Sequence, residues 1–78
     1  MAEQWKREYP RRKGWYLVRK SDGELAVRAF GKGQWWTDMG RGNGKDGWLG
    51  HVTDPGYEWL RRVGDIEKDK PSLEAASA

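Results

Sequence analysis

Residues 40–50, GRGNGKDGWLG, are the first candidate for chemistry in this sequence, because five of these eleven residues are glycine. The glycines at positions 42, 44 and 47 match G-x-G-x-x-G, the spacing that brings a backbone close to the pyrophosphate of a dinucleotide. That fingerprint needs a strand before it and a helix after it, whereas Trp48 and Leu49 follow here and too few residues remain for two crossovers. The glycines therefore indicate a loop between two strands, in which Arg41 and Lys45 could contact phosphate.

The sequence lacks the side chains from which a catalytic or metal centre is usually built. His51 is the only histidine and there is no cysteine, so neither a zinc site nor a nucleophile–base pair can be assembled from the usual groups. The aspartates at positions 22, 38, 46 and 54 adjoin turn residues, and turn formation explains them. We expect a protein that is not an enzyme and has no cofactor or metal, with His51 as a half-exposed strand residue.

Aromatic and basic side chains together suggest a binding surface instead. Trp15, Phe30 and Trp35 are predicted to lie side by side across three strands, with Arg28 next to them. Proteins that bind single-stranded nucleic acid stack bases on such aromatics and contact phosphate with neighbouring cations. In the alternative interpretation, which we favour for so small a chain, residues 48–66 cover this face and the aromatics belong to the core.

The net charge of +3 is concentrated at the start of the chain. Residues 1–20 contain seven lysines and arginines against two acids, residues 21–53 four against four, and residues 54–78 four against six. The basic segment leads into Trp15 through Arg11, Arg12 and Lys13. Such a segment suggests an anionic partner such as nucleic acid, although solubility is the simpler explanation.

Two turns are predicted to position these residues. The run GWYLVRKSDGELAVRAFG indicates a hairpin with a two-residue type I′ turn at Asp22-Gly23, which places Val18 opposite Val27 and Trp15 opposite Phe30. A second turn at Lys32-Gly33 leads into a third strand and places Phe30 opposite Trp35 and Ala29 opposite Trp36. In this register the core face carries Tyr16, Val18, Leu25, Val27, Ala29 and Trp36. The other face carries Trp15, Leu17, Phe30 and Trp35, with Arg19 and Arg28 among them.

The rest of the chain completes a small β domain. WLGHVT indicates a fourth strand, and residues 55–63 fit either a helix or a fifth strand, with Gly56 favouring a turn and then a strand. We predict a mainly β domain over residues 13–66, a small antiparallel meander of about five short strands that forms an SH3-like, partly open barrel or a highly twisted sheet. A flexible basic N-terminal segment, residues 1–12, is expected to precede this domain, and a disordered tail, residues 67–78, to follow it.

The segments GWYLVR, DGELAV, QWW and HVTDPGYEWL resemble small tryptophan-rich proteins of unknown function encoded by phages and prophages. The resemblance covers roughly residues 13–63 and implies an accessory role in the cytoplasm of a bacterial host cell. No apolar run reaches the length of a signal peptide or membrane span, so no membrane association is expected. We expect a non-enzymatic module that binds a host protein, with single-stranded nucleic-acid binding as the alternative. The residues expected to bind are Arg11, Arg12, Lys13, Trp15, Arg28, Phe30, Trp35, Arg41 and Lys45.

Overall fold

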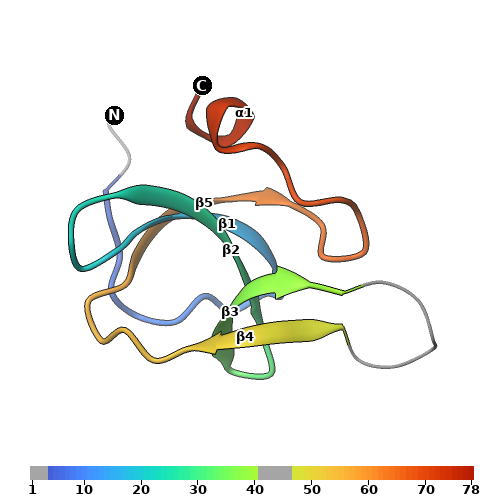
Figure 1. Cartoon of the computed structure of the whole chain (residues 1–78). Helices are drawn as coiled ribbons and strands as arrows, with labels where there is room; N and C mark the ends of the chain where they lie inside the picture. The colour runs from blue at the N-terminus through green and yellow to red at the C-terminus, as the bar shows by residue number, and fades with distance from the viewer. Residues whose placement is uncertain (1–3, 41–46) are drawn as a thin grey trace.

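Five antiparallel strands form a single curved sheet, and a short helix follows near the C-terminus (Figure 1). The computed structural model describes residues 4–40 and 47–78. The order of the strands in the sheet is β4-β3-β2-β1-β5, so β4 and β5 are its edges and the sheet does not close into a barrel. The elements are β1 (Gly14–Arg19), β2 (Leu25–Gly31), β3 (Gln34–Met39), β4 (Trp48–Val52), β5 (Glu58–Gly64) and α1 (Leu73–Ser77). The predicted mainly β fold, with five antiparallel strands in a sheet that is not closed, is confirmed, as is a fifth strand in place of a helix.

The turn between β2 and β3 is the predicted one. Lys32 and Gly33 have φ angles of 54° and 73°, and a type I′ turn requires positive φ at both of its central residues. The turn places Phe30 opposite Trp35, as expected. Both strands therefore keep the predicted register.

The turn between β1 and β2 is one residue longer than predicted. Lys20 N–H donates to the Glu24 carbonyl at 2.9 Å, and Gly23 N–H donates to the Lys20 carbonyl at 2.9 Å. Residues 21–23 thus form a three-residue loop in which Gly23, with a φ of 89°, takes the left-handed conformation. Asp22 is not among the residues with positive φ, whereas the expected type I′ turn would require it.

This extra residue makes the predicted register of β1 wrong. Val18 lies opposite Ala26, and Trp15 lies opposite Ala29 instead of Phe30. Because neighbouring side chains alternate between the two faces of a sheet, a shift of one residue moves every β1 side chain to the other face relative to β2. Trp15 and Phe30 consequently point to opposite faces.

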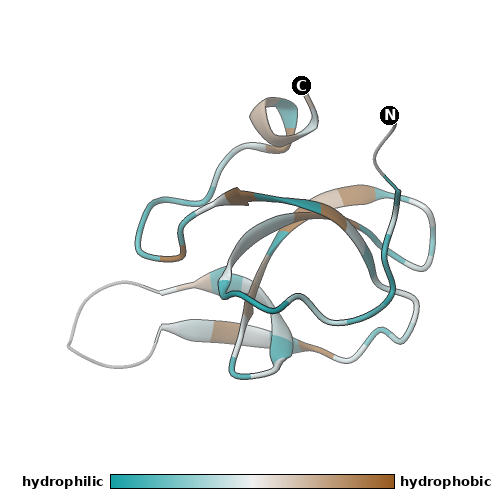
Figure 2. Ribbon diagram, turned by 180° about the vertical axis from the view of Figure 1, so that it is seen from behind, coloured by the Kyte–Doolittle hydropathy of each residue, from teal (hydrophilic) through white to brown (hydrophobic). Residues whose placement is uncertain are grey.

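Residues 4–13, which we call the arm, lie along β5 although the sequence indicated a flexible segment. Lys6 N–H donates to the Trp59 carbonyl at 2.8 Å, and Trp59 N–H donates to the Lys6 carbonyl at 2.9 Å. Pro10 is buried, and the Tyr9 ring lies 5.6 Å from that of Phe30. In Figure 2 the arm crosses in front of the curved strands and is coloured mostly hydrophilic. The polar composition of this segment gave no indication of the few contacts that hold it against the sheet.

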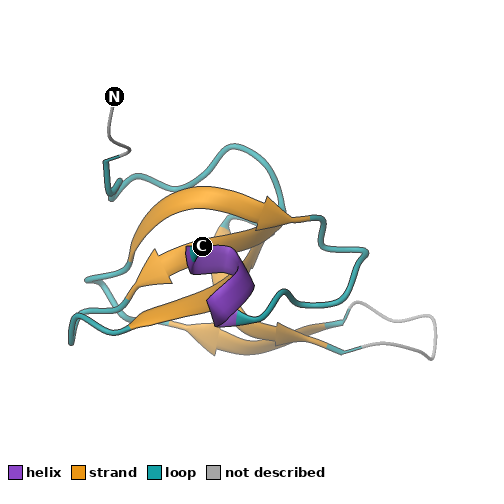
Figure 3. Ribbon diagram, turned by 90° about the horizontal axis from the view of Figure 1, so that it is seen from above, coloured by secondary structure: helices purple, strands orange, loops and turns teal. Residues whose placement is uncertain are grey.

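Residues 67–78, where a disordered tail was expected, include α1. The Ser72 hydroxyl caps the helix by accepting from Ala75 N–H at 3.1 Å, and Ala76 is only 4% exposed. The helix contacts β1 and β2 (Figure 3) and lies on the opposite side of the sheet from Phe30, against which Tyr9 of the arm packs. A single buried alanine in a polar segment gives almost no sequence signal. No helix in the described part of the chain has the length and apolar character needed to cross a membrane.

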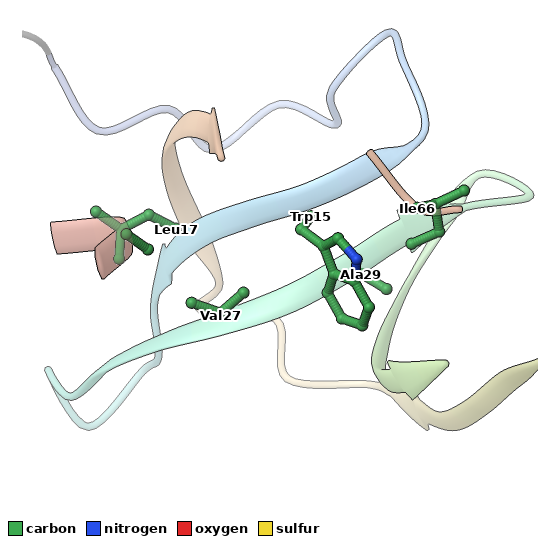
Figure 4. Packing of buried hydrophobic residues seen from close by; sticks show 6 residues of the cluster. Trp15, Leu17, Val27, Ala29 and Ile66 are labelled. Carbon is green, nitrogen blue, oxygen red and sulfur yellow. The ribbon is translucent and has the colours of Figure 1, made fainter. Parts of the chain in front are cut away.

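Both faces of the sheet are buried, each by its own cluster of side chains. The helix-side cluster consists of Trp15, Leu17, Val27, Ala29, Ile66 and Ala76 (Figure 4). The arm-side cluster consists of Tyr16, Val18, Ala26, Phe30, Trp35 and Tyr57. The predicted core face is therefore wrong, because its buried residues are divided between the two clusters. The face that was predicted to be a possible binding surface is also buried.

Two irregularities in β5 decide which of its side chains face the arm. The register of β5 against β1 shifts twice, with one extra β5 residue at each shift. Trp59 lies opposite Val18, and Arg62 lies opposite Tyr16. Residues three apart in a regular strand point to opposite faces, but a bulge between them restores a common face. Trp59 and Arg62 thereby share the face of Tyr16.

Candidate functional site

A groove of about 530 Å³ lies between the arm and the strands β1 and β5. Ligand pockets commonly measure roughly 300–1,000 Å³, so this volume is large enough for a ligand. We call it the arm groove; it is lined by Lys6, Glu8, Tyr9, Arg11, Arg12, Tyr16, Trp59 and Arg62. Four of these eight residues are cations and one is an acid. The lining therefore favours a negatively charged ligand.

Two aromatic side chains of the sheet fasten the arm in place. The Tyr16 hydroxyl donates to the Arg12 carbonyl at 2.6 Å, and Trp59 Nε1 donates to the Glu8 carbonyl at 2.6 Å. The two rings lie 5.1 Å apart and nearly perpendicular, at 78°. The arm backbone is thus held at Glu8 and Arg12, on either side of Tyr9.

Two of the four cations are anchored to carbonyl groups. Arg62 Nε donates to the Lys13 carbonyl at 3.2 Å. Lys6 Nζ donates to the Leu60 carbonyl at 3.2 Å and lies 4.3 Å from the centre of the Trp59 ring, within the range of a cation–π contact. Both side chains are therefore oriented by the protein before any ligand binds.

The other two cations, Arg11 and Arg12, are available to a ligand. Both residues are exposed, and their guanidinium groups make no hydrogen bond or ion pair within residues 4–40 and 47–78. Burial raises the pKa of the Tyr16 hydroxyl, while the positive charges of Arg62 and Arg12 act in the opposite direction. Both guanidinium groups therefore lie close enough to the Tyr16 hydroxyl to favour its charged form.

Tyr9 is the exposed aromatic residue of the arm groove. At 62% exposure it is the most accessible tryptophan, tyrosine or phenylalanine that the structure describes. The Phe30 ring supports it from the side of the sheet, at 5.6 Å and a tilt of 36°. Tyr9 also lines an adjoining hollow of about 310 Å³ that includes Trp35 and His51. Its ring offers a flat, supported surface that solvent can reach.

Trp15, Phe30 and Trp35 do not form a row and are buried in the core, where the favoured interpretation placed them. Their exposed fractions are 1%, 6% and 6%. Phe30 and Trp35 stack edge to face at 5.0 Å within the arm-side cluster, whereas Trp15 belongs to the helix-side cluster. The predicted alignment fails because it depended on the wrong register of β1.

The other predicted site residues are only partly brought together. Arg28 is used inside the fold, since its Nε donates to the Tyr57 hydroxyl at 3.1 Å. Arg41 and Lys45 lie outside the described residues. The arm groove thus contains Arg11 and Arg12 from the predicted set, with the exposed Lys13 next to them in the chain. His51 is an exposed residue of β4, 5.3 Å from the Trp36 ring.

Six residues of the arm groove were missed by the sequence analysis. These are Lys6, Glu8, Tyr9, Tyr16, Trp59 and Arg62. The run YPRR could have identified Tyr9, because it places an aromatic residue directly before a proline and two arginines. Trp59 and Arg62 had no such signal, since only the bulges in β5 bring them to one face.

Acidic side chains near the arm groove serve as structural partners. Glu58 accepts from Arg19 at 2.8 Å and from Arg7 at 3.3 Å. The hydrogen bond from Arg19 is the main reason that the pKa of Glu58 is lowered. Across the described residues, no group of three or more histidine, aspartate or glutamate side chains is placed to hold a metal ion.

Comparisons of the chain with protein-family models, curated proteins and solved structures returned no match. The resemblance to phage and prophage proteins therefore stays a prediction.

Proposed function

We propose that the protein is a small, non-enzymatic binding module whose arm groove takes an anionic ligand. The observation that carries this proposal is the set of four cations around the Tyr16 and Trp59 rings, with Glu8 as the one acid in the lining. Two of the cations are already oriented by carbonyl groups. A preorganised site of this kind loses less side-chain entropy when a ligand binds.

The host protein expected from the sequence would enter the arm groove with an acidic segment. Arginine, tyrosine and tryptophan, which line it, are the residues that contribute most at protein interfaces. A nucleic acid would enter with its phosphates, which arginine can bind through two parallel hydrogen bonds. Both partners supply negative charge, so in either case affinity should fall as salt rises.

The test uses inorganic polyphosphate, a polyanion without rings or side chains, and follows tryptophan fluorescence. Replacing Arg11 and Arg12 by alanine should weaken binding by about tenfold or more, since a hydrogen bond to a charged group contributes roughly 1.5–3 kcal/mol. The matched control replaces Lys68 and Lys70, which follow β5 and are exposed, by alanine. Both double variants remove two positive charges, but only the first changes the arm groove.

Two results would reject the proposal. The first is an equal loss of affinity in both double variants, which would assign binding to net charge. The second is the absence of any polyphosphate binding by the unmodified protein at about 50 mM salt, where phosphate contacts are strong.

A further inference from the structure

We infer that the anionic ligand is a single-stranded nucleic acid, with a base stacked on Tyr9 and phosphates held by the arginines. This inference rests on the proposed function and adds the class of ligand. The arm groove combines cations with the exposed Tyr9 ring, which the Phe30 ring supports from the side of the sheet. Base–aromatic stacking next to a positively charged groove is the general way in which proteins bind single strands.

The backbone around Tyr9 is fixed, which prepares its ring for stacking. Glu8 accepts the hydrogen bond from Trp59 Nε1, and Pro10 is buried and has a restricted φ. Tyr9 lies between these two anchored residues. A ring on a fixed backbone loses little freedom when a base stacks on it.

The arginines lie at a suitable distance from this ring along the chain. Two or three residues of extended chain span at most about 7–11 Å, so the long side chains of Arg11 and Arg12 can reach the phosphate of a nucleotide stacked on Tyr9. Arg62 enters the same arm groove from β5. Three of the four cations are arginine, whose planar guanidinium group matches phosphate better than an ammonium does.

A single strand fits these features better than a duplex or an acidic peptide. The bases of a duplex are stacked on each other, so they would leave Tyr9 unused. The aspartate and glutamate side chains of an acidic peptide would neutralise the arginines but bring no ring to stack on Tyr9. The exposed carboxylate of Glu8 in the lining would repel any polyanion, and the strand must therefore pass on the side of the arginines.

The test compares three probes of equal charge at about 50 mM salt. They are a thymidine oligonucleotide about ten nucleotides long, an abasic oligonucleotide of the same length, and an acidic peptide. The thymidine strand should bind more tightly than the abasic strand by roughly 5- to 150-fold, the effect of one stacked base.

Variants of Tyr9 identify the stacking ring. Tyr9→Ala should remove the preference for thymidine over the abasic strand, whereas Tyr9→Phe, which keeps the ring, should retain it. Leu49→Ala, at an exposed apolar residue of β4 that is 50% exposed, should behave like the unmodified protein. Melting curves show whether each variant is folded.

The possible failures are distinguishable. Equal affinity for the thymidine and abasic strands would overturn the stacking inference and leave the anion-binding proposal intact. Tighter binding of the acidic peptide than of the thymidine strand would overturn the inference in favour of a protein partner. If no probe binds, both proposals are rejected.

Discussion

Trp15 lies at the centre of the helix-side cluster, where it is 1% exposed and its Nε1 donates to the Lys68 carbonyl at 3.1 Å. Trp36, which the sequence analysis placed in the core, packs against the same cluster but is only partly buried. A large aromatic residue stabilises a core in proportion to the volume that its removal would leave empty. Trp15, and not Trp36, is therefore the tryptophan on which this cluster depends.

Trp15→Ala should cost roughly 3–5 kcal/mol in the free energy of unfolding. For a domain whose total stability is about 5 kcal/mol, this loss would leave the protein largely unfolded. Trp36→Ala should cost less, and urea unfolding followed by circular dichroism measures both. A larger loss for Trp36→Ala would contradict the assignment of the core.

At the scale of elements, Asp54 joins the turn before β5 to the turn between β1 and β2. Its Oδ1 accepts from Gly56 N–H at 2.8 Å, and its Oδ2 accepts from the Ser21 N–H and hydroxyl at 3.1 and 2.8 Å. These hydrogen bonds, first that from Gly56 and then those from Ser21, lower the pKa of Asp54. The pKa of Glu58 is lowered as well, mainly by Arg19.

A carboxyl group with a lowered pKa in the folded state stabilises the fold above its unfolded pKa, which is near 4. That contribution is lost as the pH falls through the folded value. We therefore expect the urea midpoint of the unmodified protein to fall on acidification below about pH 4. Asp54→Asn should lower the midpoint at neutral pH and reduce the further fall in acid.

Glu67→Gln is the matched control for this prediction. It removes an exposed carboxylate that accepts no hydrogen bond in the described part of the chain, so its response to pH should equal that of the unmodified protein. If the urea midpoint of Asp54→Asn also depended on pH as that of the unmodified protein does, Asp54 would not link the two turns in solution.

The elements also show which features of the fold could be predicted from the sequence. The strands and the Lys32-Gly33 turn were predictable, because alternation and positive φ are local requirements. The length of the turn at Asp22-Gly23 was predicted wrongly, because Asp-Gly fits a two-residue turn and Gly also fits the left-handed position of a three-residue loop. That difference of one residue determines which β1 side chains point to each face of the sheet.

The candidate site was less predictable than the fold. Arg11 and Arg12 were identified because a basic segment is visible in the composition. Trp59 and Arg62 were not, because their common face depends on bulges against β1. Tyr9 became part of a site only through the docking of the arm on β5, and a contact between such distant segments leaves no periodic pattern in the sequence.

At the scale of the whole molecule, α1 covers one face of the sheet and Tyr9 of the arm covers the other, while Trp5, at the start of the arm, packs against the helix-side cluster (Figure 3). Deleting residues 1–10 should remove the two backbone hydrogen bonds between Lys6 and Trp59 and uncover Phe30. One net hydrogen bond contributes about 1 kcal/mol, and each kcal/mol shifts the Tm of such a domain by about 4–8 °C. Scanning calorimetry should therefore give a Tm at least about 5 °C lower.

Arg7→Ala provides the comparison for this deletion. The Arg7 side chain is 83% exposed and pairs with Glu58 at 3.3 Å, and exposed ion pairs of this kind contribute little. Its Tm should stay close to that of the unmodified protein. A deletion that left the Tm unchanged would mean that the arm adds nothing to the stability of the sheet.

The three-residue loop of residues 21–23 also restricts which insertions and deletions the chain can tolerate. Every residue from Gly14 to Val18 is buried, so the apolar pattern of β1 does not distinguish one register from the next. The length of the loop makes that choice. Deleting one residue there would shift the register of β1 by one. Trp15 and Leu17 would then face the arm-side cluster, and Tyr16 and Val18 would face the helix-side cluster. Over evolution, changes in the length of this loop should therefore be rare.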